Sequence, residues 1–195
     1  LRLAKIARDT KDPPNGTIDR DAKGEPTGVL KESAQGLVRR LLPDETAEQL
    51  DAGIRDLAKA FNAEGMTGLK DPGISMDTWN AYKRVQASGD LSVRVFALWQ
   101  GGRSIDGARK LIAERGQTTR PYESTGDDHM IAGGVKLYID GSGGARTAWL
   151  YDDWNKGFSG TDSGNRGYPA SDPDTVRQLI RLYHDAGIHV STHSI

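Results

Sequence analysis

The sequence predicts an α/β protein built on a parallel sheet. From residue 43 to residue 195, segments typical of strands and of amphipathic helices alternate in the order β-α-β-α-β-α-β. The run 93–99 is apolar at nearly every position, as in parallel strands buried on both faces. Connections that follow the strands are longer than those that precede them. Open doubly wound sheets and (β/α)8 barrels both place active sites on such connections, so both architectures stay open.

Residues 1–42 differ from the rest because they are polar and rich in turn-forming residues. Two short extended pieces, 17–21 and 27–30, flank a turn at 23–26, which predicts a β-hairpin. Residues 34–42 are expected to form a short helix. We therefore divide the chain into a hairpin and short-helix segment and a following α/β domain.

The α/β domain begins at Pro43, and its first helix has a defined start and end. Asp44 or Thr46 can cap it, and Gly65 suits the left-handed exit that ends a helix. The turn-forming triplet 71–73 is expected to end the first strand. The first helix is expected to end at 64, and later helices are expected at 77–88, 105–114 and 172–186. Strands are expected at 66–70, 91–99, 133–140 and 188–193. The stretches 116–130 and 141–170 are expected to be irregular.

Composition excludes several classes of partner and site. Lys and Arg total 26 and Asp and Glu total 27, so the net charge of −1 favours neither nucleic acid nor an anionic membrane. No run approaches the roughly 18 apolar residues of a membrane span. The absence of cysteine excludes disulfides and thiolate zinc sites, and it leaves the cellular compartment open.

Lys136 lies in the middle of an apolar strand, where a lysine is costly unless it has a partner or a function. Side chains alternate along a strand, so Val135, Leu137 and Ile139 share one face. Lys136 and Tyr138 share the other face. On an inward face a lysine can form a Schiff base, act as a base or, once carboxylated, bind a metal. A lysine in water on an edge strand, or one paired with a carboxylate, is the structural alternative.

Three further residues are candidates for the site. His193 lies near the carboxyl end of the last strand, and neutral imidazole is a common ligand of divalent metals. A hydrogen-bonded core histidine is the alternative. Asp140 and Arg146 follow the lysine strand in a glycine-rich loop that matches neither a Walker nor a Rossmann motif. We expect both to contact substrate, with a solvated loop as the alternative.

Four segments resemble a known family, and the first is RLAKIARDTKDPPNGTIDRDAKGEPTGVLKE, similar to a segment just ahead of the middle of the family's barrel. Residues 135–148, VKLYIDGSGGARTA, resemble Val-Lys-Leu-Phe-x-Asp-Gly-Ser-Leu-Gly-Ser-Arg-Thr-Ala of amidohydrolase family 3, a branch of the metal-dependent amidohydrolase superfamily that includes N-substituted formamide deformylase-like enzymes. The run EGMTGLKDPG resembles a family strand and turn, and GIHVSTHSI resembles the strand with a metal-binding histidine. Gly143 and Ala145 depart from the usual loop residues.

The resemblance implies a partial (β/α)8 TIM barrel, about strands two to five, with an N-terminal β-hairpin segment. Residues 1–42 would precede the barrel, and 43–195 would form a part that is incomplete at both ends. It implies one or two divalent ions, usually zinc, that activate water for attack on a small amide-type substrate. His193 and, if carboxylated, Lys136 would be metal ligands, with Lys136 also catalytic. The family's remaining ligands have no counterpart here.

Two ligands do not hold a catalytic zinc, which typically needs three protein ligands and an open position. We therefore expect a fragment of a hydrolase of carbon–nitrogen bonds that is inactive by itself, or one that self-associates through exposed sheet edges. One alternative is a non-enzymatic α/β binding module. Another is an enzyme that forms a Schiff base through Lys136.

Overall fold

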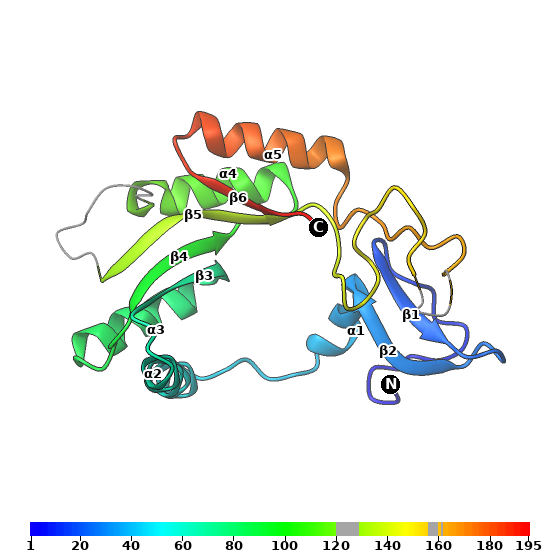
Figure 1. Ribbon diagram of the computed structural model, residues 1–195, viewed down its shortest axis with the longest axis horizontal. Helices are drawn as coiled ribbons and strands as arrows, with labels where there is room; N and C mark the ends of the chain where they lie inside the picture. Colours follow the sequence, from blue (N-terminus) through cyan, green and yellow to red (C-terminus); the bar gives the residue numbers. More distant parts are fainter. Residues whose placement is uncertain (120–128, 156–159, 161) are drawn as a thin grey trace. The chain divides into compact units, whose positions relative to one another are not determined.

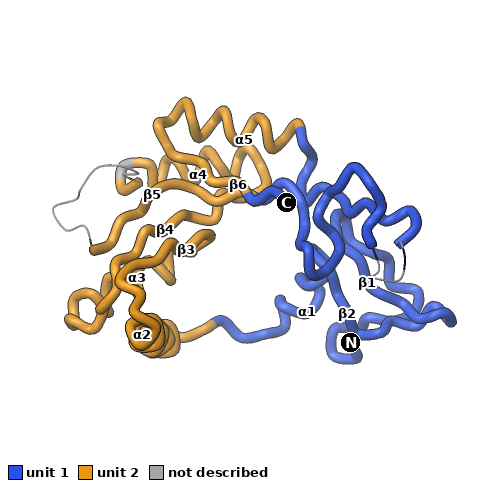
Figure 2. The backbone as a smooth tube through the Cα atoms, viewed as in Figure 1, with its two compact units in different colours: residues 1–44, 138–173, 193–195 blue, residues 45–137, 174–192 orange. Residues whose placement is uncertain are grey.

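The computed structural model describes residues 1–119, 129–155, 160 and 162–195. The chain divides into two compact units, coloured separately in Figure 2. Unit 1 contains residues 1–44, 138–173 and 193–195, and unit 2 contains residues 45–137 and 174–192. Each unit therefore combines segments that are far apart in the sequence.

Unit 1 contains the expected hairpin, whose strands pair in antiparallel fashion. Its turn passes through Gly24, which has a positive φ of 83°. Ile18 of the hairpin and Ala34 of the next segment are buried together with Ala4 and Ile6 in a small core. The elements of this region are β1 (Gly16–Arg20), β2 (Pro26–Glu32), the 3-10 turn η1 (Ser33–Gln35) and α1 (Gly36–Arg39).

In the described residues, a four-stranded sheet follows the order β3-β4-β5-β6, and the strands run parallel. Strands that are neighbours in sequence are thus neighbours in the sheet, without the reversal of a doubly wound fold. Figure 1 shows α3 (Met76–Ala87), α4 (Ile105–Arg115) and α5 (Pro173–Asp185) on one side of this sheet. The arrangement is that of a partial (β/α)8 barrel. The strands are β3 (Gly68–Ile74), β4 (Arg94–Gln100), β5 (Met130–Tyr138) and β6 (Val190–His193).

Three helices of unit 2 begin directly after a residue whose side chain accepts a backbone N–H of the first turn. Thr46 and Gln49 form a capping box in which each side chain accepts the other residue's backbone N–H, at 3.3 Å and 2.9 Å. Ser75 and Ser104 cap the next two helices. The helices are α2 (Ala47–Ala63), α3 (Met76–Ala87), α4 (Ile105–Arg115) and α5 (Pro173–Asp185), with the 3-10 turn η2 (Gly116–Thr118) after α4.

The core of unit 2 lies between the sheet and its helices. On β4, the alternate residues Val95, Ala97 and Trp99 are buried in it. Two buried polar groups find partners there. The indole Nε1 of Trp99 donates to Thr119 Oγ1 at 2.9 Å, and the hydroxyl of Tyr183 donates to the Gly101 carbonyl at 2.5 Å. Burial raises the pKa of Tyr183 to about 12, so the phenol stays protonated and remains a donor.

The expectation that residues 71–73 form a turn after a strand ending at 70 was wrong. β3 continues through Asp71, Pro72 and Gly73 to Ile74. A proline is tolerated in a strand at the edge of a sheet, where its missing N–H removes no ladder bond. The irregularity is absorbed locally, because Gly73 has a φ of 103° and the register with β4 shifts between Pro72 and Ile74.

Other boundaries differ by a few residues. The strand expected at 91–99 begins at Arg94, and the one expected at 133–140 spans Met130–Tyr138. The expected irregular stretch 116–130 lies partly outside the described residues, which omit 120–128. The same holds for residues 156–159 and 161 in the loop expected at 141–170.

Two neighbouring residues of α5 are expected to contribute very differently to the free energy of unfolding, because only one of them lies in the core. Leu179 is 1% exposed and Ile180 is 37% exposed. Leu179→Ala leaves a cavity and is expected to lower the free energy of unfolding by about 2–5 kcal/mol. Ile180→Ala is the matched control and should change it by about 0.5 kcal/mol or less. Urea denaturation measures both, and equal losses would contradict this assignment of the buried helix face.

Candidate functional site

Lys136 lies on the face of the sheet that points away from the helices. Its neighbours Val135 and Leu137 are buried in the helix-side core, so alternation gives Lys136 the opposite face. Its side chain is half-buried. In the ladder Lys136 aligns with Gln100 of β4, and its carbonyl accepts the Gly101 N–H at 2.9 Å. Lys136 is therefore held near the carboxyl end of β5.

His193 ends β6, where its ring is fixed by two contacts within unit 1. The ring lies 5.6 Å from that of Tyr138, between centroids, and Nε2 lies 2.9 Å from the Gly141 carbonyl oxygen. A carbonyl oxygen can only accept, so Nε2 carries the hydrogen of this bond. In the neutral imidazole the lone pair is then on Nδ1. The nitrogen with metal-binding capacity in this arrangement is Nδ1.

Asp140 is the buried carboxylate of the site, with 3% of its surface exposed. Its Oδ2 accepts the backbone N–H of Trp149 at 3.1 Å and of Ile195 at 3.3 Å. Its Oδ1 has no hydrogen-bond partner among the described residues and lies 3.8 Å from Nε2 of His193. Asp140 thus holds two backbone segments with one oxygen and leaves the other beside the histidine.

The loop after Asp140 turns back on itself through Thr147, which is 2% exposed. The Thr147 Oγ1 accepts the Ser142 N–H at 2.9 Å, and its hydroxyl donates to Glu32 Oε1 at 2.5 Å. Gly141 has no room for a side chain, since a Cβ there would lie 2.2 Å from Thr147 Oγ1 and 2.8 Å from Glu32 Oε1. Sequence reasoning missed Glu32 and Thr147 because no local pattern links residues that far apart.

Arg146 is engaged within the loop. Its Nε forms an ion pair with Asp162 at 3.2 Å, although the geometry is not that of a hydrogen bond. The backbone has a positive φ of 53°, and the Arg146 carbonyl accepts from Asn165 Nδ2 at 3.2 Å. The side chain is 40% exposed. Arg146 therefore has a role inside the loop that its sequence context did not predict, and its contact with substrate stays a prediction.

The structure brings Asp140 and His193 together in unit 1, whereas Lys136 belongs to unit 2. Within the described ranges, no three His, Cys, Asp or Glu side chains gather as a metal site. Within unit 1, the donors are the imidazole of His193 and the buried carboxylate of Asp140. Such donors suit a divalent metal, which requires further ligands.

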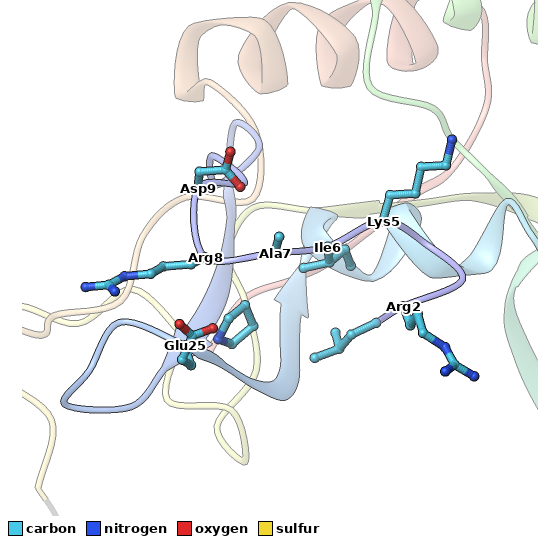
Figure 3. Close-up of a pocket in the computed structure, with 9 residues that line it drawn as sticks. Arg2, Lys5, Ile6, Ala7, Arg8, Asp9 and Glu25 are labelled. Atoms are coloured by element: carbon cyan, nitrogen blue, oxygen red, sulfur yellow. The ribbon is translucent and has the colours of Figure 1, made fainter.

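Two of the hollows formed by the described residues lie away from these side chains. One of about 970 Å³ in unit 1 is lined by Arg2, Lys5 and Arg8, whose side chains extend away from one another (Figure 3). These three basic groups therefore do not converge on one point. The other, of about 530 Å³ in unit 2, is mainly apolar, and its polar groups bind each other, since Tyr82 donates to Asp71 at 2.8 Å. Burial, reinforced by this bond, raises the pKa of Tyr82.

Comparison with known proteins shows that all of residues 1–195 match the amidohydrolase family. The chain belongs to that family. The resemblance found in the sequence, residues 135–148 included, is thus confirmed. Among the described helices, none has the length and apolar character needed to cross a bilayer.

Relatives from bacteria and archaea share the sequence or the fold. The chain is 28% identical over 200 residues to YtcJ of Bacillus subtilis (strain 168), a protein named as an amidohydrolase, and covers 35% of it. It resembles the crystal structure of an uncharacterised metal-dependent hydrolase from Pyrococcus horikoshii OT3 with a TM-score of 0.67 and 22% identity, covering 92% of this chain and 34% of that one.

A second crystal structure, also of an uncharacterised metal-dependent hydrolase, comes from Pyrococcus furiosus. Its TM-score is 0.65 at 19% identity, and the match covers 97% of this chain and 36% of that one. The chain thus spans about a third of the length of these relatives.

Close packing at Gly141 gives a test of the loop geometry. Gly141→Ala places a methyl group against Thr147 and Glu32, and is expected to destabilise unit 1 by about 1–3 kcal/mol. Gly143→Ala is the control, because a Cβ at Gly143 meets its nearest atom, Ile195 Cδ1, at an ordinary 3.9 Å. The control should cost about 0.5 kcal/mol or less. Thermal unfolding compares the two, and a tolerated Gly141→Ala would show that the loop does not pack in this way.

Proposed function

We propose that this chain supplies part of the active site of a metal-dependent hydrolase of carbon–nitrogen bonds in small, non-peptide amides. The observation that carries the proposal is His193, whose Nε2 is bound to Gly141 while Nδ1 keeps its lone pair. The buried Oδ1 of Asp140, which has no hydrogen-bond partner among the described residues, lies 3.8 Å from Nε2 of this ring. Membership of the amidohydrolase family supports the same chemistry.

His193 would hold a divalent metal through Nδ1. Lys136 would be a metal ligand only as a carbamate, formed when its neutral amine adds carbon dioxide and releases a proton, because a plain ammonium has no lone pair to donate. Nitrogen and oxygen donors without thiolates suit zinc. A catalytic zinc typically takes three protein ligands, so the remaining ligands must come from elsewhere. By itself, the chain described here should not catalyse.

When bound, such an ion lowers the pKa of a coordinated water and polarises a carbonyl oxygen. This chain's residues would position the partners of that reaction. Contact of Asp140 with substrate stays a prediction, and the partly exposed guanidinium of Arg146 can bind an anionic substituent. Self-association through sheet edges stays a prediction.

Metal binding by the full-length protein tests this proposal. His193→Ala is expected to lower zinc affinity by at least about 100-fold, more than substitutions around a ligand usually do. Lys136→Arg keeps a positive charge but cannot form the carbamate, so it should also lose metal. His184→Ala, on the exposed face of α5, is the matched control and should bind metal normally.

Competition with a chromophoric chelator measures these affinities, and elemental analysis gives the number of ions bound. Native affinity in His193→Ala would reject the proposed metal site. Native metal content in Lys136→Arg alone would reject the carbamate and leave His193 as the ligand from this chain.

Arg146→Ala tests the contact with substrate. Loss of a charge-assisted hydrogen bond, worth about 1.5–3 kcal/mol, should raise KM for anionic substrates by about 10-fold or more, with little change in kcat. Asp162→Asn is the control, because it removes the ion pair and leaves the guanidinium in place. Steady-state kinetics measure both variants, and an unchanged KM in Arg146→Ala discards the role.

A further inference from the structure

The peptide bond between Gly141 and Ser142 is held at both ends. Its carbonyl accepts from Nε2 of His193 at 2.9 Å, and its N–H donates to Oγ1 of Thr147 at 2.9 Å. A peptide group is planar, and its C=O and N–H point in opposite directions. Any group that fixes the N–H therefore also fixes the carbonyl that receives the histidine.

Thr147 can hold that N–H because Glu32 takes the threonine's own proton. The hydroxyl has one hydrogen, and its oxygen lies 2.5 Å from Glu32 Oε1, within the range of O–H donation to a carboxylate. The Oγ1 lone pairs are then available to Ser142. Donation runs in one direction, from His193 through the peptide and Thr147 to Glu32, and bonds aligned in this way strengthen one another.

Glu32 adopts an unusual backbone conformation to reach this position. At the last residue of β2, directly before η1, its φ is 50° and its ψ is −125°, in a region that residues other than glycine rarely occupy. Strain of this kind persists where the surrounding structure over-determines it, and it clusters at functional sites. The absence of a Cβ at Gly141 lets the carboxylate approach the loop backbone directly.

We infer that Glu32 is a positioning residue for His193. As the final acceptor of the relay, its carboxylate holds the Gly141 carbonyl in place, keeps Nε2 of His193 protonated and so reserves Nδ1 for a metal. The last step rests on the proposed function. Histidines that bind metals usually give their other N–H to a carboxylate or a backbone carbonyl. Here the carbonyl is itself supported by a carboxylate from a distant segment.

Two measurements on the full-length protein test the relay. Nitrogen-15 NMR of the imidazole reports the His193 tautomer in the metal-free protein, and chelator competition reports zinc affinity. Thr147→Val keeps the side-chain shape and removes the hydroxyl. It should convert a single Nε2–H tautomer into a mixture and lower zinc affinity by about 10-fold. Thr147→Ser, which keeps the hydroxyl, is the matched control and should retain both native values.

Glu32→Gln gives a second, milder test in case Thr147→Val does not fold. The amide oxygen can still accept the threonine proton, but a neutral acceptor is roughly half as strong, so a loss of about 3-fold in zinc affinity is expected. A purely structural role of Glu32 would lower the melting temperature without changing the tautomer. A native tautomer in both Thr147→Val and Glu32→Gln would overturn the inference.

The relay and the proposed function fail in different ways. If His193→Ala binds zinc normally while Thr147→Val still shifts the tautomer, the metal site is rejected and the relay stands. If His193→Ala loses zinc while Thr147→Val keeps the native tautomer and affinity, the relay is rejected and the metal site stands.

Discussion

Burial on one face of a parallel sheet is the constraint on which the rest of this structure depends. Val95, Ala97 and Trp99 of β4 and Val135 and Leu137 of β5 all enter the same core beneath the helices. Because side chains alternate along a strand, a shift of one residue would expose this whole set to the opposite face. The burial of these residues therefore also fixes the face on which Lys136 lies.

Glycines allow backbone segments and rings to approach at the places where the chain needs close contact. At Gly133, a Cβ would lie 1.9 Å from the ring of Phe96, so the aromatic side chain occupies the volume that a side chain on β5 would fill. At Gly141, the loop backbone lies against Glu32 and Thr147. In both cases the missing side chain leaves space for a neighbour from another segment, rather than providing flexibility.

A set of polar groups in unit 1 lies around the end of β6. Asp140 binds two backbone segments with one oxygen, while Glu32, Thr147 and the Gly141–Ser142 peptide lead to His193. Buried polar groups are costly unless they are paired, so a set like this one is stable only when its members are positioned to hydrogen-bond with one another. The oxygen of Asp140 without a described partner is the exception, and it lies beside the imidazole.

Local chemistry made most of the elements predictable. The cap expected at Asp44 or Thr46, the apolar run through β4 and the alternation around Lys136 are all patterns of neighbouring residues, and the structure follows them, with Thr46 as the cap. The motif of residues 135–148 also indicated the family. Prediction failed at β3, where Asp71, Pro72 and Gly73 have the composition of a turn. Their place at the edge of the described sheet makes a strand possible despite the proline.

Residue patterns alone predicted the alternating α/β order, the face of Lys136 along its strand and the family. The folded structure was needed to show that Glu32 reaches the loop after β5, that Arg146 pairs with Asp162, and that Nε2 of His193 is bound to Gly141. These contacts join segments separated by between 16 and 115 residues. Sequence patterns report short-range periodicity, whereas such pairings form only when the folded backbone brings distant groups within hydrogen-bonding distance.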